Sequence, residues 1–278
     1  MSVAVGVAAV DGLALATDSR TIQQRADHPE HYRVLSDSAE KLFILADRFA
    51  IATYGMATID EKTIRGHMED FAVNLPTDLI ECAKALGAFF HQKLSDVTPP
   101  RRGDLSVYEI GFPLGFLVGG YDSDGIGRFV DVKVRPSAQP EVKDTDISTE
   151  NPGHAPRGQV DAIERMLHGV DWTAVDVGRI AIDDELRRQL EGLHYDILIP
   201  TTVDDAAAFA GFLVQTQIGM QSRHDGTMAK PKEVPGAGGA VRVAAITRGG
   251  TEWVRNQGRP LVKATSRRLP LGRAGEAQ

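Results

Sequence analysis

The first twenty residues, MSVAVGVAAVDGLALATDSR, constrain the fold of this chain more than any other stretch. Val3 to Ala9 and Leu13 to Thr17 are apolar runs, and the Asp11-Gly12 pair between them is a strong signal for a tight hairpin turn. Such a hairpin returns the chain to its origin, so Asp18 is expected beside the first residues. Chain termini are loose unless something ties them down. A start that forms a core strand therefore indicates that the start itself is used.

Ser2 supplies a chemical reason for using it. Removal of Met1 would leave Ser2 with a free α-amine, whose reference pKa is roughly 7.7–8.0. One residue could then provide both a hydroxyl nucleophile and a general base. The alternative is that Met-Ser is simply a common start, although the strand–turn–strand behind it weighs against that. Lys41 leads another apolar run, Leu42 to Leu45, and is either a solvated strand end or a buried functional ammonium.

Composition excludes several classes of function. The net charge of −7 argues against a nucleic-acid partner, which would need a basic patch. No run of 18 apolar residues and no secretory signal is found, and the single cysteine, Cys82, allows no internal disulfide, so a cytoplasmic protein without membrane association is expected. His28 and His31 lack a third ligand nearby, and Gly119-Gly120 is not a dinucleotide fingerprint. No metal and no cofactor are therefore expected.

The order of elements predicts an α+β fold. We expect further strands near residues 41–45, 49–54, 115–121, 127–134, 240–247 and 251–254, and helices at 57–75, 77–95, 159–167, 175–190 and 202–223. Residues 21–37 are interpreted as a long loop or hairpin, and 136–158 as a loop. Strand pairs separated by helix pairs predict a four-layer αββα sandwich, with two antiparallel sheets between helical layers. Residues 1–255 would form this single domain, followed by a partly disordered extension at 256–278.

These features together resemble the proteasome β-subunit family of N-terminal nucleophile hydrolases. The family's start is matched by Ser2, Val5-Gly6, Asp11-Gly12 and Ala16–Arg20, its catalytic lysine strand by Lys41-Leu42-Phe43, and its oxyanion glycine by Ala52–Gly55. The family's long fourth helix, acidic residue, Gly-Gly pair and final strand pair resemble, in that order, Thr202–Arg223, Asp225, Gly238-Gly239 and Ala240–Val254. The resemblance covers roughly Ser2 to Val254. It implies an αββα fold of the N-terminal-nucleophile type and hydrolysis of peptide (amide) bonds.

The resemblance also implies a role for each matching residue. Ser2 would be the nucleophile, Asp18 and Lys41 a charged pair beside it, and the Gly55 amide the oxyanion donor. Asp225 would orient the amino terminus. The resemblance further suggests a substrate pocket formed by Arg20, Thr53 and Met56.

Departures from the family pattern, among them a longer Thr21–Glu40 segment, fit a bacterial proteasome-like homologue rather than the proteasome itself. The nucleophile is Ser instead of Thr, Ala237 stands where a Ser is usual, and Gly226–Gly236 is an insertion. The expected partners are a peptide or protein substrate and further copies of the chain in a homo-oligomeric ring, with helical apolar faces at the contacts and any unfoldase unknown. Two alternatives stay open: an inactive ring-forming structural homologue, or a small-molecule amidase.

Overall fold

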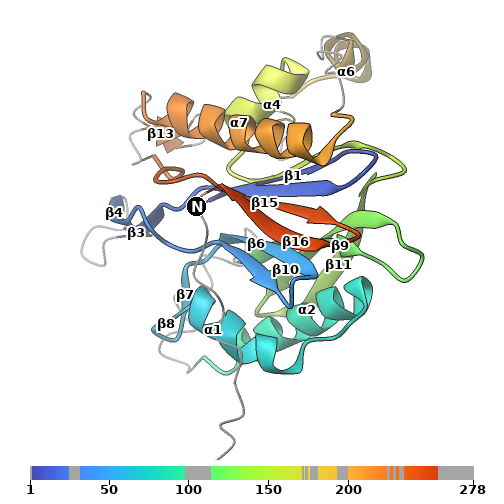
Figure 1. Ribbon diagram of the computed structural model, residues 1–278. Helices are drawn as coiled ribbons and strands as arrows, with labels where there is room; N and C mark the ends of the chain where they lie inside the picture. Colours follow the sequence, from blue (N-terminus) through green and yellow to red (C-terminus); the bar gives the residue numbers. More distant parts are fainter. Residues whose placement is uncertain are drawn as a thin grey trace, which may run out of the picture.

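Two five-stranded antiparallel sheets form the centre of the computed structural model, which describes residues 2–24, 32–97, 114–170, 172, 175, 181–192, 200–223, 226–227, 230–231 and 235–255 (Figure 1). The first sheet has the order β12 (Gly153–Gly158), β1 (Val3–Ala8), β2 (Leu13–Thr17), β15 (Arg242–Thr247), β16 (Gly250–Arg255). The second has the order β11 (Ala138–Ser148), β10 (Gly127–Arg135), β9 (Leu114–Tyr121), β6 (Phe49–Gly55), β5 (Leu42–Leu45).

The predicted N-terminal hairpin is confirmed. Strands β1 and β2 pair antiparallel with Ala8 opposite Leu13, and the Ala9 amide donates to the Gly12 carbonyl at 2.8 Å. Every residue of both strands is buried, which explains why the run is apolar on both faces. The hairpin places the end of β2 beside the start of β1, where the Asp18 amide donates to the Val3 carbonyl.

Helices cover the outer faces of the two larger sheets. Helix α7 (Val203–Gln221) packs on β1, β2 and β15, and α4 (Asp161–His168) packs on α7. Helix α2 (Leu79–Ser95) packs on β9, β10 and β11, next to α1 (Ile64–Phe71) and a short 3₁₀ turn at Ala72–Asn74. Apolar side chains from both sheets meet in a third cluster between them. Figure 1 shows α6 (Asp184–Glu191) beyond α4, away from the sheets.

The prediction of a four-layer αββα sandwich is wrong as a description of this fold. The described residues form five antiparallel sheets rather than two, and five α-helices. The additional sheets are two-stranded ribbons made by β3 (Thr21–Gln24) with β4 (Tyr32–Ser36), β7 (Thr58–Ile59) with β8 (Lys62–Thr63), and β13 (Gly226–Thr227) with β14 (Lys230–Pro231). The β3–β4 pair agrees with the hairpin alternative for residues 21–37. The other two ribbons have only two residues per strand, too short for hydrophobic patterning to reveal them.

Two element predictions are also corrected. The helix expected over Ala57–Leu75 begins only at Ile64, because β7 and β8 precede it and the Thr63 hydroxyl caps it by accepting from the Gly66 amide. The loop expected over Pro136–Gly158 contains β11 and β12 instead. Most of β11 is exposed or half-buried, so its polar composition fits an edge strand with a solvated face. The C-terminal extension at 256–278 lies outside the described residues.

Candidate functional site

A buried carboxylate lies at the open end of the β1–β2 hairpin, beside the start of β1. Asp18 directly follows β2 and is 0% exposed. Its Oδ1 accepts from the Val3 amide at 3.1 Å, and its Oδ2 accepts from the Arg20 and Gly238 amides at 3.1 Å each. The carboxylate thereby joins the start of β1, the segment after β2 and the loop before β15. Its bond to Val3 places it one residue from Ser2.

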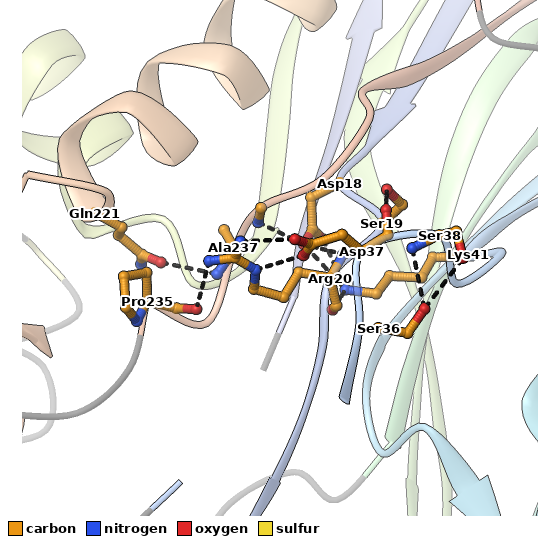
Figure 2. Close-up of polar contacts among 11 residues, drawn as sticks. Asp18, Ser19, Arg20, Ser36, Asp37, Ser38, Lys41, Gln221, Pro235 and Ala237 are labelled. Atoms are coloured by element: carbon orange, nitrogen blue, oxygen red, sulfur yellow. Dashed lines mark hydrogen bonds and ion pairs between the residues drawn. The ribbon is translucent and has the colours of Figure 1, made fainter. Parts of the chain in front are cut away.

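Lys41 completes this buried cluster. Its Nζ donates to both Asp18 oxygens, at 2.9 and 3.0 Å, and also to the Arg20 carbonyl oxygen. Lys41 directly precedes β5, and Figure 2 shows its side chain extending toward Asp18 at the end of β2. Burial lowers the pKa of the Lys41 ammonium below the ordinary lysine value, and the attraction of Asp18 offsets only part of that effect. The ammonium therefore loses its proton more readily than a surface lysine does.

Ser2 is itself buried and lines a partly open cavity of about 700 Å³ together with Gly55 and Gly158. The Ser2 carbonyl accepts from the Gln159 amide at 2.8 Å. Gly158 has a φ of 85°, and a side chain there would overlap that same carbonyl oxygen, so glycine is required for β12 to approach Ser2 this closely. Strands of both large sheets thus meet around the candidate nucleophile.

The residues assigned to a substrate pocket occupy other environments. The Arg20 guanidinium binds the Asp37 carboxylate at 2.6 and 3.0 Å and so ties β2 to the segment after β4. The Thr53 hydroxyl is buried and donates to the Gly115 carbonyl at 3.4 Å, and Met56 packs against the core beneath α1 and α2. The part of the cavity lining that the structure describes contains Ser2 and Gly55 but neither these three side chains nor Lys41.

The loop before β15 contributes backbone rather than side chains. Asp225, the candidate for orienting the amino terminus, lies outside the described residues. The Ala237 amide donates to Gln221 Oε1 at 2.8 Å, and the next amide, of Gly238, donates to Asp18. A side chain at Gly238 would collide with the Arg20 guanidinium. The structure therefore explains the glycine at 238 by its close approach to Asp18 and Arg20.

Sequence reasoning missed a second polar cluster in the cavity wall. The Tyr54 hydroxyl donates to Asp131 Oδ1 at 2.6 Å, and Arg157 Nε donates to Asp131 Oδ2 at 2.9 Å. All three residues line the cavity with Ser2. The only available signal was the position of Tyr54 immediately before Gly55, since no spacing in the sequence links residues 54, 131 and 157.

Two kinds of feature are not found among the residues that the structure describes. Within the described ranges, no group of three His, Cys, Asp or Glu side chains is placed to hold a metal ion. Among the helices described, none is long and apolar enough to cross a membrane.

Comparison with solved structures identifies the fold. A Gly-1 mutant of Anbu from Hyphomicrobium sp. strain MC1 matches with a TM-score of 0.51 and 14% identity, over 92% of this chain and 86% of that one. The chain has a proteasome-like fold. Anbu from Yersinia bercovieri, described as an ancestral β-subunit, gives a TM-score of 0.49 at 13% identity, over 91% of this chain and 87% of that one. No family model and no curated protein matches the sequence.

Proposed function

We propose that this chain is an N-terminal-nucleophile hydrolase that cleaves peptide (amide) bonds, with Ser2 as the nucleophile once Met1 is removed. The observation that carries the proposal is the buried Asp18 carboxylate, which binds the Val3 amide on one side and the Lys41 ammonium on the other. A charged pair next to the first residue of a core strand is costly to bury. Because the pair lies beside Ser2, activation of that serine accounts for burying it, and the proteasome-like fold is consistent with this role.

The proposed reaction proceeds through an acyl-enzyme. Ser2 Oγ attacks the substrate carbonyl, and its proton passes to the Ser2 α-amine, directly or through water. The C–N bond then breaks, and the leaving amine takes that proton. Water attacks the resulting ester with the same amine as base, which releases the acid and restores Ser2. The positive charge of Lys41 lowers the pKa values of the Ser2 amine and hydroxyl.

The oxyanion formed in each step needs a donor, and we assign the Gly55 amide to it. Gly55 has a φ of 95°, a conformation that glycine adopts without strain, at the point where β6 ends in the cavity. Loss of one such donor typically costs around 3 kcal/mol in transition-state stabilisation.

The test combines mass spectrometry with a covalent probe. Purified protein should lack Met1 by intact mass, and a peptide electrophile should label the Ser2-containing peptide once per chain. Ser2→Ala should abolish labelling. Ser222→Ala provides a matched control, because the Ser222 hydroxyl donates to the Gly219 carbonyl at the carboxyl end of α7. Protein that lacks Met1 yet takes up no probe between pH 6 and 9 contradicts the proposal.

One observation favours a second candidate, a catalytically inactive structural subunit. The three N–H bonds of the Lys41 ammonium are directed at Asp18 Oδ1, Asp18 Oδ2 and the Arg20 carbonyl. An ammonium satisfied in this way could serve only to join β2 to β5. In that case Lys41 substitutions would change stability alone, and the probe would label no variant.

We further propose that residues 1–255 form a single domain that assembles into a homo-oligomeric ring. The apolar faces of the two long helices, which the sequence analysis assigned to subunit contacts, are buried in the chain's own core. Phe212 and Met220 are large apolar side chains exposed on α7 and are therefore better placed for subunit contacts. Light scattering at micromolar concentration tests this, and a monomeric mass would count against it.

A further inference from the structure

The two glycines that line the cavity with Ser2 each follow a large polar residue. Tyr54 precedes Gly55 at the end of β6, and Arg157 precedes Gly158 at the end of β12. These strands belong to different sheets. Gly55 is the proposed oxyanion donor, and Gly158 lies against the Ser2 carbonyl. Tyr54 and Arg157 are therefore the chain neighbours of Gly55 and Gly158, the two glycines that lie around Ser2.

The Tyr54 ring is held in one place by its packing. It is buried in the cluster between the two sheets and lies over Gly115 of β9, where any side chain would overlap the ring. Its hydroxyl donates to Asp131 Oδ1 at 2.6 Å. Burial, with the Asp131 charge as a second cause, raises the pKa of Tyr54 far above its usual range. The hydroxyl therefore remains a proton donor to Asp131 at any working pH.

Arg157 reaches the same carboxylate from the opposite sheet. Its Nε donates to Asp131 Oδ2 at 2.9 Å, and its Nη1 donates to the Pro156 carbonyl at 2.8 Å. Lys133 Nζ lies 3.8 Å from the same Oδ2. Asp131, on β10, is 5% exposed. One of its oxygens binds Tyr54, the residue before Gly55, and the other binds Arg157, the residue before Gly158.

We propose that Asp131 is a positioning residue that sets the spacing between Ser2 and the Gly55 amide. This role rests on the proposed function, because it matters only if Ser2 attacks a carbonyl whose oxyanion Gly55 binds. The carboxylate links the two sheets at the cavity through Tyr54 and Arg157. A displacement of about 1 Å in such a site can cost on the order of 10²-fold in rate. The nucleophilicity of Ser2, which depends on its amine and Lys41, does not require this link.

That difference gives a direct test. Tyr54→Phe removes only the hydroxyl, and Asp131→Asn removes the charge at nearly constant volume. Each is compared with wild type using two probes with the same peptide portion: trileucine p-nitrophenyl ester, whose acyl transfer forms an oxyanion, and trileucine vinyl sulfone, whose alkylation of Ser2 forms none at Gly55. We expect the rate constant for the ester to fall about 10²-fold, and that for the sulfone to stay near the wild-type value.

Tyr121→Phe is the matched control, because this hydroxyl also bonds across elements, to the Asp11 carbonyl at 3.3 Å, but stands away from Ser2. It should change neither rate. Arg157→Lys provides a third variant should Asp131→Asn fail to fold. Equal loss with both probes would show that Asp131 is only structural, and no loss with either would show that the link is unnecessary; both results overturn the proposal. Wild-type protein without Met1 that reacts with neither probe refutes the proposed function, and this role with it.

Discussion

Replacing Lys41 with Ala tests the catalytic assignment most directly. The substitution removes the ammonium from a carboxylate that is 0% exposed, while Asp18 keeps its three backbone donors, the amides of Val3, Arg20 and Gly238. The protein therefore loses an ion pair but not every partner of the buried charge. The consequences for stability and for activity can be worked out separately.

The expected loss of stability follows from the burial. Removing one partner of a buried ion pair costs about 3–5 kcal/mol. The three remaining amide hydrogen bonds, each worth about 1.5–3 kcal/mol to a charged group, keep Asp18 satisfied and favour the lower end. With about 2–4 °C of melting temperature per kcal/mol in a domain of this size, a loss of about 3 kcal/mol lowers the melting temperature by about 6–12 °C.

The assay pairs thermal melting with acylation of Ser2. Lys41→Ala should fold, melt lower as estimated, and lose most of its turnover of the trileucine ester. Lys41→Met retains more of the side-chain volume and should melt higher than the alanine variant while remaining equally inactive. The double variant with Ser2→Ala should be no less active than either single variant, because both changes disable one catalytic unit.

The Arg20–Asp37 pair serves as a control for loss of an ion pair as such. Its bond is short, at 2.6 Å, but the Asp37 side chain is 49% exposed, so solvent screening limits its contribution to about 1 kcal/mol or less. Asp37→Ala should thus leave the melting temperature nearly unchanged. If Lys41→Ala lowers the melting temperature yet acylates at the wild-type rate, the lysine is structural and the catalytic assignment is refuted.

Two further predictions follow from single positions. Gly158→Ala should destabilise the fold by at least about 2 kcal/mol, because its φ is positive and its side chain would displace Ser2; Gly219→Ala, in open space on α7, should instead stabilise by about 1 kcal/mol, and urea unfolding measures both. Burial and the nearby His168 ring lower the pKa of His154, so between that lowered pKa and 6.5 the unfolded chain binds more protons. The stability that His154 contributes is present above pH 6.5 and lost as pH falls through its lowered pKa; urea unfolding at pH 7.5 and 5.0 should show a smaller acid loss in His154→Gln.

The sequence predicted the N-terminal hairpin because its signals are local. The Asp11-Gly12 turn and two fully apolar runs require only neighbouring residues to specify a paired, buried structure. The long helix at 202–223 is likewise predicted from its own apolar residues, and the structure adds the Thr202 cap at its start. By contrast, the sequence of β11 and β12 does not predict strands, because a polar strand at a sheet edge takes its pairing partner from elsewhere in the chain.

The site shows the same division. The contact of Asp18 with Lys41 was anticipated from the resemblance, and the hairpin supplies the physical reason that Asp18 lies near Ser2. The pairing of Arg20 with Asp37 was not anticipated, because the segment after Thr21 has no apolar pattern to fix its path. The Tyr54–Asp131–Arg157 cluster depends on three strands from two sheets, and its members become neighbours only through tertiary packing.

The two members of the buried ion pair have different reasons to be present. Asp18 accepts from three backbone amides that converge from the start of β1, the end of β2 and the loop before β15, so the local backbone would leave buried donors unsatisfied without it. These three donors would keep the Asp18 carboxylate hydrogen-bonded with no lysine nearby. Lys41, in contrast, satisfies one carbonyl, and its main contribution is the positive charge that it places against the Asp18 carboxylate. Backbone hydrogen bonding therefore accounts for Asp18 without reference to catalysis. In the proposed function, the Lys41 ammonium is held by the carboxylate that accepts from the Val3 amide, and it supplies the positive charge that activates Ser2.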